Sequence, residues 1–226
     1  MKEIKEPSKV IIYGDSDFAE QVYYQLESDG RYQVVAFTVD EARLDKTSFK
    51  GLPVIEFQKL KEHYSLEDVA LFPAIGYSKL NKIRELVMSE IKQSGFQLFT
   101  YISKNAVISS QVSIGEGVYI CEFVSIGANA KIGQSVLILP NSSIAHNVVI
   151  SDYSYVSQST TIGGNVTVKS YSFLGLGCTI KNSITIEEYN IIGSAANVIK
   201  STTPNGVYIG NPAKRLKDVD LLNIKI

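Results

Sequence analysis

The hydrophobic residues divide the 226-residue chain into two parts that have different periods. From Ile108 to Val198, every sixth residue is a branched aliphatic, and no insertion interrupts the pattern. A fixed short period of this kind is typical of a solenoid. Two positions before each aliphatic the residue is mostly small, and three positions after it Asn and Gly are frequent. Because Asn and Gly tolerate left-handed backbone angles, which tight corners require, we expect three hexads to close one triangular coil of 18 residues.

The first hundred residues instead alternate short apolar runs with amphipathic segments. This alternation predicts a small parallel sheet with helices, a Rossmann-like α/β domain over residues 1–101. The expected strands and helices are Lys9–Tyr13, Phe18–Leu26 (helix), Val34–Thr38, Val54–Ile55, Phe57–Tyr64 (helix), Val69–Ile75, Lys79–Ser94 (helix) and Gln97–Tyr101. We expect the stacked triangular coils to form a prism over residues 102–198. A capping segment is expected over residues 199–226, since the open end of a solenoid needs a cover.

Composition and charge exclude several classes of protein. The formal net charge of −1 argues against a nucleic-acid binder, which needs a basic surface. No apolar run approaches the ~20 residues that span a bilayer, and the N-terminal residues have no apolar signal core. Cys121 and Cys178 are far apart and have no CxxC or His partner. This spacing is typical of reduced packing residues in a cytoplasmic protein rather than of a disulfide or a metal site.

His146 is the main candidate for chemistry. The other histidine, His63, is expected on a solvated helix surface. His146 comes two residues after the interior Ile144, so its side chain should point outward near a corner, as a general base or as an incidental surface residue. One coil further on is Gly164, which leaves free space and a backbone N–H beside the imidazole. A thioester carbonyl requires that space and that donor.

Two other regions offer weaker candidates, and the P-loop, zinc-protease and nucleophile-elbow motifs are absent from the sequence. The loop Gly14–Ala19 has one glycine, which argues against a pyrophosphate cradle of the NAD type. Asp40 follows the second expected strand, and it suits either a ribose or base contact or a plain turn. Gly76-Tyr77-Ser78 precedes a segment with Lys79, Lys82 and Arg84, which favours either a phosphate site at a helix start or a capped surface helix.

Five stretches in order carry a family resemblance: KVIIYG, AIGYSKLNKIR, the hexads, NSSIAHNVVISDYSYVSQSTTIGGNVTVKSYSFLGLG and GVYIGNPAKRL. Together they resemble the hexapeptide-repeat sugar acyltransferases typified by sialic acid O-acetyltransferases and bacillosamine-pathway N-acetyltransferases. The resemblance implies a left-handed parallel β-helix, a homotrimer with active sites between subunits, acetyl-CoA as cosubstrate without a metal, and a nucleotide-linked sugar held by the N-terminal domain. By the same resemblance, the functional residues are His146 as catalyst, Gly164, Leu176, Ser194 and Lys214 for CoA, and Asp17, Asp40, Gly76 and Tyr77 for the sugar nucleotide.

Three positions depart from that family. Asp17-Phe18 stands where its first loop often has Gly-His, and Ala145 and Tyr155 replace an acidic residue and a second histidine of the bacillosamine enzymes. The resulting expectation is an acetyl-CoA-dependent N-acetyltransferase of bacterial surface-glycan biosynthesis that acts on a nucleotide-linked amino deoxysugar. Sugar O-acetylation and a non-catalytic trimeric binding protein are alternatives. The N-terminal α/β domain disfavours an acyltransferase of an amino-acid pathway.

Overall fold

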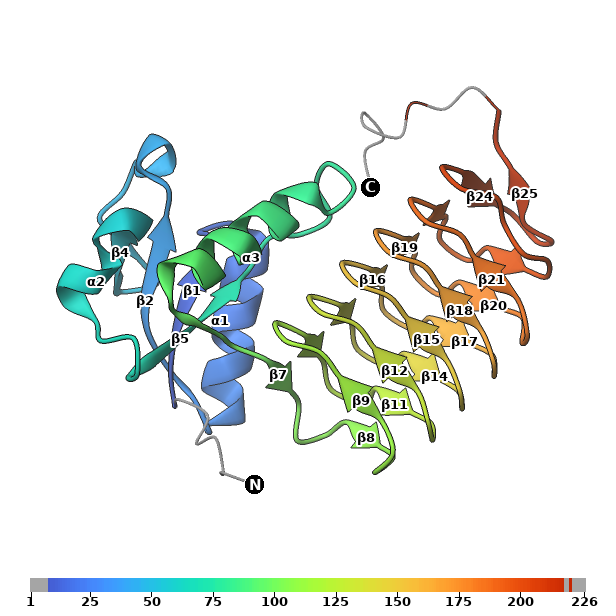
Figure 1. Cartoon of the computed structure of the whole chain (residues 1–226), viewed down its shortest axis with the longest axis horizontal. Helices are drawn as coiled ribbons and strands as arrows, with labels where there is room; N and C mark the ends of the chain where they lie inside the picture. The colour runs from blue at the N-terminus through green and yellow to red at the C-terminus, as the bar shows by residue number, and fades with distance from the viewer. Residues whose placement is uncertain (1–7, 218–219, 221–226) are drawn as a thin grey trace. The chain divides into compact units, whose positions relative to one another are not determined.

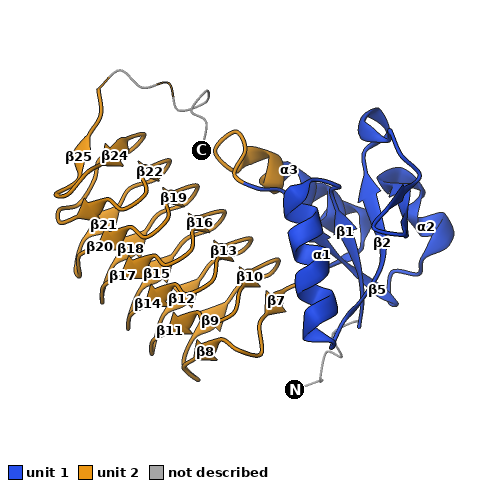
Figure 2. Ribbon diagram, turned by 180° about the vertical axis from the view of Figure 1, so that it is seen from behind, with its two compact units in different colours: residues 1–76, 86–99 blue, residues 77–85, 100–226 orange. Residues whose placement is uncertain are grey.

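The computed structural model describes residues 8–217 and residue 220 (Figure 1). The chain forms two compact units, one of residues 1–76 and 86–99 and the other of residues 77–85 and 100–226 (Figure 2). The segment 77–85, which the sequence pattern assigns to the α/β domain, therefore packs with the second unit. The outer parts of the expected first domain and capping segment, residues 1–7, 218–219 and 221–226, lie outside the described residues.

The first unit is built on a sheet whose strand order is β3-β4-β2-β1-β5-β6. The strands are β1 (Lys9–Tyr13), β2 (Gln33–Val39), β3 (Ser48–Phe49), β4 (Leu52–Glu56), β5 (Val69–Pro73) and β6 (Gln97–Leu98). All neighbours are parallel except β3 and β4. The helices are α1 (Asp17–Asp29), η1 (Glu41–Arg43), η2 (Phe57–Lys59), α2 (Leu60–His63) and α3 (Lys82–Ser94). The connections leave β1 in one direction and β5 in the other, so the topological switch point lies between β1 and β5.

The sequence pattern locates these elements closely, with two corrections. The helix expected from Lys79 begins at Lys82, because Lys79, Leu80 and Asn81 all have positive φ values, of 48°, 53° and 63°. Residues with positive φ cannot form part of a right-handed helix, so α3 begins only after this turn. The strand expected over Gln97–Tyr101 is two strands, β6 and β7 (Tyr101–Ile102), which belong to different sheets.

The second unit contains a parallel β-helix of two-residue strands that form three flat sheets. The sheet of β7 continues with β10 (Tyr119–Ile120), β13 (Leu137–Ile138), β16 (Tyr155–Val156), β19 (Phe173–Leu174) and β22 (Ile191–Ile192). The second sheet contains β8 (Val107–Ile108), β11 (Ser125–Ile126), β14 (Ser143–Ile144), β17 (Thr161–Ile162), β20 (Thr179–Ile180) and β23 (Asn197–Val198). The third contains β9 (Ser113–Ile114), β12 (Lys131–Ile132), β15 (Val149–Ile150), β18 (Thr167–Val168) and β21 (Thr185–Ile186).

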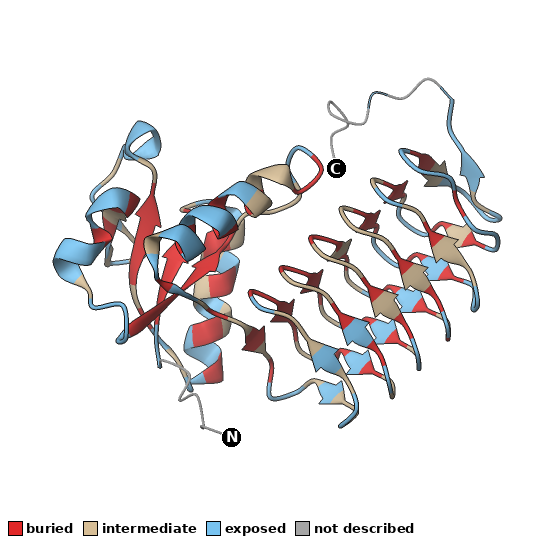
Figure 3. Cartoon of the chain, viewed as in Figure 1, coloured by how far each residue is buried: buried red, intermediate tan, exposed pale blue. Residues whose placement is uncertain are grey.

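The register confirms the 18-residue coil. Ser125 pairs with Ser143 and Ile126 with Ile144, and the same offset recurs between the successive strands of each sheet. The hexad aliphatics lie at the second position of each strand and are buried from Ile120 onward, as the red segments of the prism show (Figure 3). They fill the interior, so the first residue of each strand points away from the axis.

The corners also confirm the sequence expectation. Every sixth residue from Gly117 to Ala195 has a positive φ, although Gln111, at the same position of an earlier hexad, is not among them. Several of these positions carry Asn or Gly. Bulky residues also adopt the positive φ, at Phe123, Tyr153, Tyr171 and Tyr189. The hexad lattice therefore imposes the left-handed conformation even on bulky side chains, at a cost of roughly 1–2 kcal/mol per residue.

After the last hexad the chain extends the first sheet. β24 (Val207–Ile209) pairs in parallel with β22, and β25 (Lys214–Arg215) pairs antiparallel with β24. These strands cover backbone groups of the last coil that a solenoid would otherwise leave open. Among the helices of the described residues, none is long and apolar enough to cross a membrane.

Candidate functional site

His146 lies in the turn between β14 and β15, where its side chain is exposed. Its imidazole lies directly over Gly164 of the next coil. A Cβ atom added to Gly164 would come within 2.6 Å of His146 Nε2 and 2.7 Å of Cε1. The ring therefore occupies the space that any other residue at position 164 would need. The sequence lattice places the histidine and the glycine side by side, and the structure agrees.

Asn147 holds the other ring nitrogen. Its Nδ2 atom lies 3.2 Å from His146 Nδ1 and donates to Asn165 Oδ1 over 3.0 Å. Asn129 Nδ2 in turn donates to Asn147 Oδ1 over 3.2 Å. With Nδ1 engaged in this way, Nε2 is the nitrogen beside Gly164. With Ala145 and Tyr155 in place of the family's partners, the sequence leaves the Asn147 region or a neighbouring subunit to tune His146, and the 18-residue spacing of the three asparagines is visible in the hexads.

Leu176 and Ser194 are stacked one coil apart at a different corner of the prism. The sheet of β14, β17 and β20 separates this corner from the corner of His146 and Gly164. Both side chains are exposed, Leu176 to 52%. Within one chain the expected CoA-contacting residues therefore fall on the two edges of one flat sheet. One hexad separates the two edges, and an extended hexad spans at most about 20 Å, at roughly 3.3 Å per residue.

Lys214 lies in β25 and lines a pocket of about 340 Å³ at the end of the prism. The pocket is formed by Val198, Ile199, Lys200, Ser201, Tyr208, Pro212, Ala213 and Lys214. Lys200 belongs to the same corner stack as His146 and Gly164, since successive members are 18 residues apart. A cationic pocket thus ends the corner on which the imidazole lies.

In the first unit, Asp17, Asp40 and Gly76 follow three neighbouring strands, β1, β2 and β5, at their carboxyl ends. Asp40 accepts a hydrogen bond from the Tyr13 hydroxyl. Burial and this hydrogen bond both raise the pKa of Tyr13, so the phenol stays a donor. The carboxylate is thus fixed at the sheet edge where ligands of parallel sheets bind.

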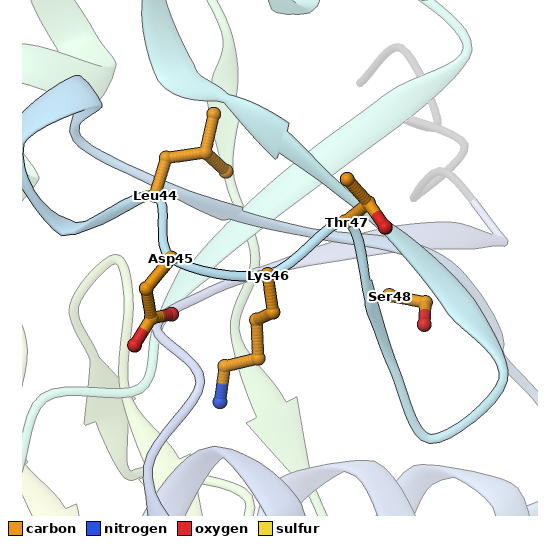
Figure 4. Close-up of a pocket in the computed structure, with 5 residues that line it drawn as sticks. All are labelled: Leu44, Asp45, Lys46, Thr47 and Ser48. Atoms are coloured by element: carbon orange, nitrogen blue, oxygen red, sulfur yellow. The ribbon is translucent and has the colours of Figure 1, made fainter.

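A loop that follows Asp40 borders a pocket of about 450 Å³, lined by residues 44–48. Figure 4 shows Leu44 and Lys46 extending to opposite sides of this loop. Lys46 Nζ lies 2.8 Å from a carboxylate oxygen of Asp15, which follows β1, and this hydrogen bond raises the pKa of Lys46. The ion pair joins the loops after β1 and β2. No pattern in the sequence links Asp15 with Lys46, so this ion pair is visible only in the structure.

Tyr77 lies in the second unit, where its ring packs 4.7 Å from the ring of Phe173. Its hydroxyl is buried without a hydrogen-bond partner among the described residues, and burial raises its pKa. Tyr77 therefore packs within the second unit, whereas Asp17, Asp40 and Gly76 belong to the first.

The cations that follow Tyr77 are used for packing. Arg84 is fully buried and donates to Asn81 Oδ1 (2.9 Å), the Ser135 carbonyl (3.1 Å) and the Tyr153 carbonyl (3.3 Å). Lys82 lies 3.9 Å from the centre of the Tyr171 ring and 3.0 Å from Glu85 Oε2. Both interpretations of this segment, a phosphate site at a helix start and a capped surface helix, place a helix start near Ser78, whereas α3 begins at Lys82 and Arg84 in its first turn is buried in the second unit.

Within the described part of the chain, the cysteines are buried and the potential metal ligands are not clustered. Cys121 and Cys178 are buried, and burial raises their pKa values to about 12 and about 11. A buried thiol held neutral in this way is a packing residue rather than a nucleophile. Across residues 8–217, no group of three His, Cys, Asp or Glu side chains is arranged to hold a metal ion.

Comparison with known proteins identifies both units. Residues 9–91 match the PglD N-terminal domain family and residues 97–206 match the GMPPB C-terminal domain family. A histidine-to-asparagine mutant of perosamine N-acetyltransferase from Caulobacter crescentus, solved with CoA and GDP-perosamine, is 26% identical. Its TM-score is 0.83, over 93% of this chain and 97% of that one. WeeI from Acinetobacter baumannii is 28% identical, with a TM-score of 0.82 over 92% of this chain and 99% of that one.

The chain is an acyltransferase, and it resembles the hexapeptide-repeat sugar N-acetyltransferases. The acetyltransferase domain of PglB from Neisseria gonorrhoeae shares the fold at 21% identity, with a TM-score of 0.81 over 92% of this chain and 100% of that one. Curated protein sequences contain no significant match. These comparisons confirm the family resemblance and the fold class of this acyltransferase, an α/β domain followed by a left-handed β-helix.

Proposed function

We propose that this acyltransferase transfers an acetyl group from acetyl-CoA to the amino group of a nucleotide-linked deoxysugar, with His146 as the general base. The observation that carries the proposal is the exposed imidazole over Gly164, with Nδ1 held by Asn147 and Nε2 beside the glycine. Support for the substrate class comes from the Caulobacter perosamine N-acetyltransferase, which was solved with CoA and GDP-perosamine.

The chemistry follows from this arrangement. The amine nitrogen attacks the thioester carbonyl carbon, and His146 Nε2 accepts the ammonium proton as the C–N bond forms. No backbone acceptor for the Gly164 N–H is present among the described residues, so this donor is free to stabilise the carbonyl oxygen as it becomes negative. The C–S bond then breaks, and the imidazolium returns the proton to the CoA thiolate.

The positions of the candidate CoA residues favour an assembly of several copies. Gly164 and the pair Leu176 and Ser194 lie on opposite edges of one sheet, so a homotrimer would bring one edge of each prism to the other edge of its neighbour. The large apolar side chains of Val107, Phe123 and Leu176 are 73%, 64% and 52% exposed on this sheet and its edge. Exposed apolar patches are typical of interfaces. Analytical ultracentrifugation should give three times the mass of one chain.

For the nucleotide we propose the carboxyl edge of the first unit's sheet, where Asp17, Asp40 and Gly76 lie. Lys214 and its pocket are proposed for the phosphate-bearing end of CoA, since an ammonium group there complements phosphate. The two buried thiols fit a reducing cytoplasm. The family resemblance implies a place in bacterial surface-glycan biosynthesis, at the acylation of an activated sugar.

The deciding experiment measures thiol release from acetyl-CoA with UDP-, dTDP- and GDP-linked 4-amino sugars and their 4-hydroxy counterparts. We expect turnover with an amino sugar, and a loss of roughly 10²–10⁴-fold in His146→Ala with an unchanged circular dichroism spectrum. His63→Ala is the control, because His63 is exposed on α2. Unchanged turnover in His146→Ala would refute the general base. Preference for the hydroxy sugars would establish O-acetylation, and binding without any turnover would establish a non-catalytic protein.

A further inference from the structure

Three asparagines form a hydrogen-bonded ladder along the His146 corner. Asn129, Asn147 and Asn165 are 18 residues apart, with φ values of 60°, 57° and 59°. Asn129 donates to Asn147, and Asn147 donates to Asn165. All three side chains are exposed, so the amides are linked to one another in a row beside the imidazole.

The ladder has two directions of donation. In the direction described above, Asn147 presents its NH₂ group both to Asn165 Oδ1 and to His146 Nδ1. Nδ1 is then an acceptor, and the neutral imidazole carries its proton on Nε2. The oxygen and nitrogen ends of an amide have nearly the same shape, so the whole row fits the same positions with every amide turned over. Asn147 Oδ1 would then face His146 Nδ1, and Nε2 would carry the lone pair.

General-base catalysis distinguishes the two directions. A base that accepts a proton at Nε2 needs an unprotonated Nε2 before the reaction, and it carries N–H groups on both nitrogens after it. Only the reversed ladder supplies an acceptor for the Nδ1–H group in both states. We propose that the asparagine ladder sets the tautomer of His146 and that catalysis uses the reversed direction. This makes Asn147 a positioning residue, and the inference rests on the proposed role of His146.

The residues stacked next to His146 have no titratable side chain, so the asparagine amides are the groups that can set its tautomer. The residues stacked on His146 along its corner are Ala128 on one side and Gly164 and Asn182 on the other, and none of them titrates. The charged residues on or next to this corner are Lys131, which begins β12, Lys181, which precedes Asn182, and Lys200, which lies one coil beyond Asn182. Among the described residues, the recorded partner of Nδ1 is the Asn147 amide.

Two single substitutions should drive the ladder in opposite directions. An aspartate accepts hydrogen bonds and donates none when ionised. Asn129→Asp therefore draws the Asn147 NH₂ group toward residue 129 and turns Oδ1 to His146. Asn165→Asp draws it toward residue 165 and keeps NH₂ on Nδ1. Each variant adds one negative charge one coil from Asn147. The imidazole lies over Gly164, so electrostatic attraction alone would act more strongly on it in Asn165→Asp, the variant for which the ladder predicts the loss of turnover.

The first readout is the tautomer of His146 itself, by ¹⁵N NMR of the ring nitrogens. The chain has only two histidines, so a His63→Gln background leaves one imidazole to assign. We expect the neutral ring to carry its proton on Nδ1 in Asn129→Asp and on Nε2 in Asn165→Asp. Equal tautomer populations in the two variants would overturn the inference. This measurement does not depend on turnover, so an inactive wild-type protein would count against the proposed function alone.

The second readout is turnover. We expect kcat/KM to be kept or raised in Asn129→Asp and to fall at least about tenfold in Asn165→Asp, relative to the unsubstituted protein. Asn205→Asp is the control, because the exposed Asn205 also has a positive φ (54°) but lies beside Glu188, away from the corners of His146 and Leu176, and it should change neither readout. Equal losses in the two ladder variants, or a loss of the same size in Asn205→Asp, would also overturn the inference.

Discussion

The corner that carries His146 and the corner that carries Tyr153, Tyr171 and Tyr189 share one backbone geometry. At both, a residue with φ between 55° and 59° recurs every 18 residues, at Asn147 and Asn165 on one corner and at the three tyrosines on the other. On the first corner the side chains are exposed amides that contact an imidazole. On the second they are stacked rings with centroids 5.3 and 4.8 Å apart. The lattice provides the corner, and the side chain at the left-handed position decides between an open polar row and a packing surface.

The tyrosine corner is packed because the segment 77–85 lies on it. Lys82 contacts the Tyr171 ring, the Tyr171 hydroxyl donates to Glu85 over 2.8 Å, and Arg84 bonds the Tyr153 carbonyl. The left-handed turn before α3 costs roughly 1–2 kcal/mol per residue. Burial of Leu80 and Asn81 from that turn offsets this cost. At the asparagine corner no described segment occupies the same place over His146, which stays exposed.

The largest effect on stability is expected from Arg84→Ala. The substitution removes the donor to Asn81 Oδ1 and to the Ser135 carbonyl, leaves the Tyr153 carbonyl with the Asn81 amide, and opens a cavity at a fully buried position. We expect a loss of about 3–5 kcal/mol in the free energy of unfolding, measured by urea denaturation. The control is Arg215→Ala, because the exposed Arg215 donates to Thr203 and Asn205 on the surface. A cost for Arg84→Ala no larger than that of the control would show that the segment is not anchored at Arg84.

Tyr171→Asn gives the tyrosine corner the residue of the asparagine corner. It removes two ring stacks, the contact with Lys82 and the hydrogen bond to Glu85, while asparagine keeps the left-handed backbone. We expect a loss of about 2–4 kcal/mol in stability, with kcat unchanged. Thermal unfolding with a parallel activity assay checks both parts. A stable variant that loses turnover would show that the tyrosine corner also takes part in catalysis.

Gly164→Ala tests the open corner. The added Cβ would meet the His146 ring at 2.6 Å, so the exposed imidazole must move. We expect kcat/KM to fall about 100-fold, equivalent to about 2.7 kcal/mol, with less than 1 kcal/mol lost in stability. If the glycine acts only by making room for the ring, the double variant His146→Ala/Gly164→Ala should be no less active than His146→Ala. A further drop in the double variant would assign Gly164 a second role, in keeping with its free N–H.

Much of the prism could be predicted because its signals are local and repeated. The hexads predict the 18-residue register, and the Asn and Gly positions predict the left-handed corners. The same lattice predicts that His146 lies beside Gly164. Each of these inferences needs only the spacing of residues along one chain.

The remaining features depend on contacts between distant segments. Arg84 is the clearest example: its charge and its place in an amphipathic pattern predict a surface residue, yet it is buried against coils more than 50 residues away. The ion pair of Asp15 with Lys46 likewise joins two loops that only the sheet brings together. The direction of the asparagine ladder is a property of hydrogen-bond polarity, which residue spacing does not encode.

The smallest expected effect concerns the pH dependence of the tyrosine corner. Burial acts to raise the pKa of Glu85, but hydrogen bonds from Lys82 and Tyr171 outweigh it and leave the pKa below its usual value. A carboxyl with a lowered pKa in the folded state stabilises the fold above its unfolded pKa, and this contribution is lost as the pH falls through the folded one. Glu85→Gln should therefore cost up to about 1 kcal/mol at pH 7 and progressively less below pH ~4. Urea denaturation between pH 3 and 7 measures this difference, with the exposed Glu188→Gln as the control from the same corner. A difference that stays constant over this range would show that Glu85 stabilises the corner by packing alone, without a contribution from its ion pair with Lys82.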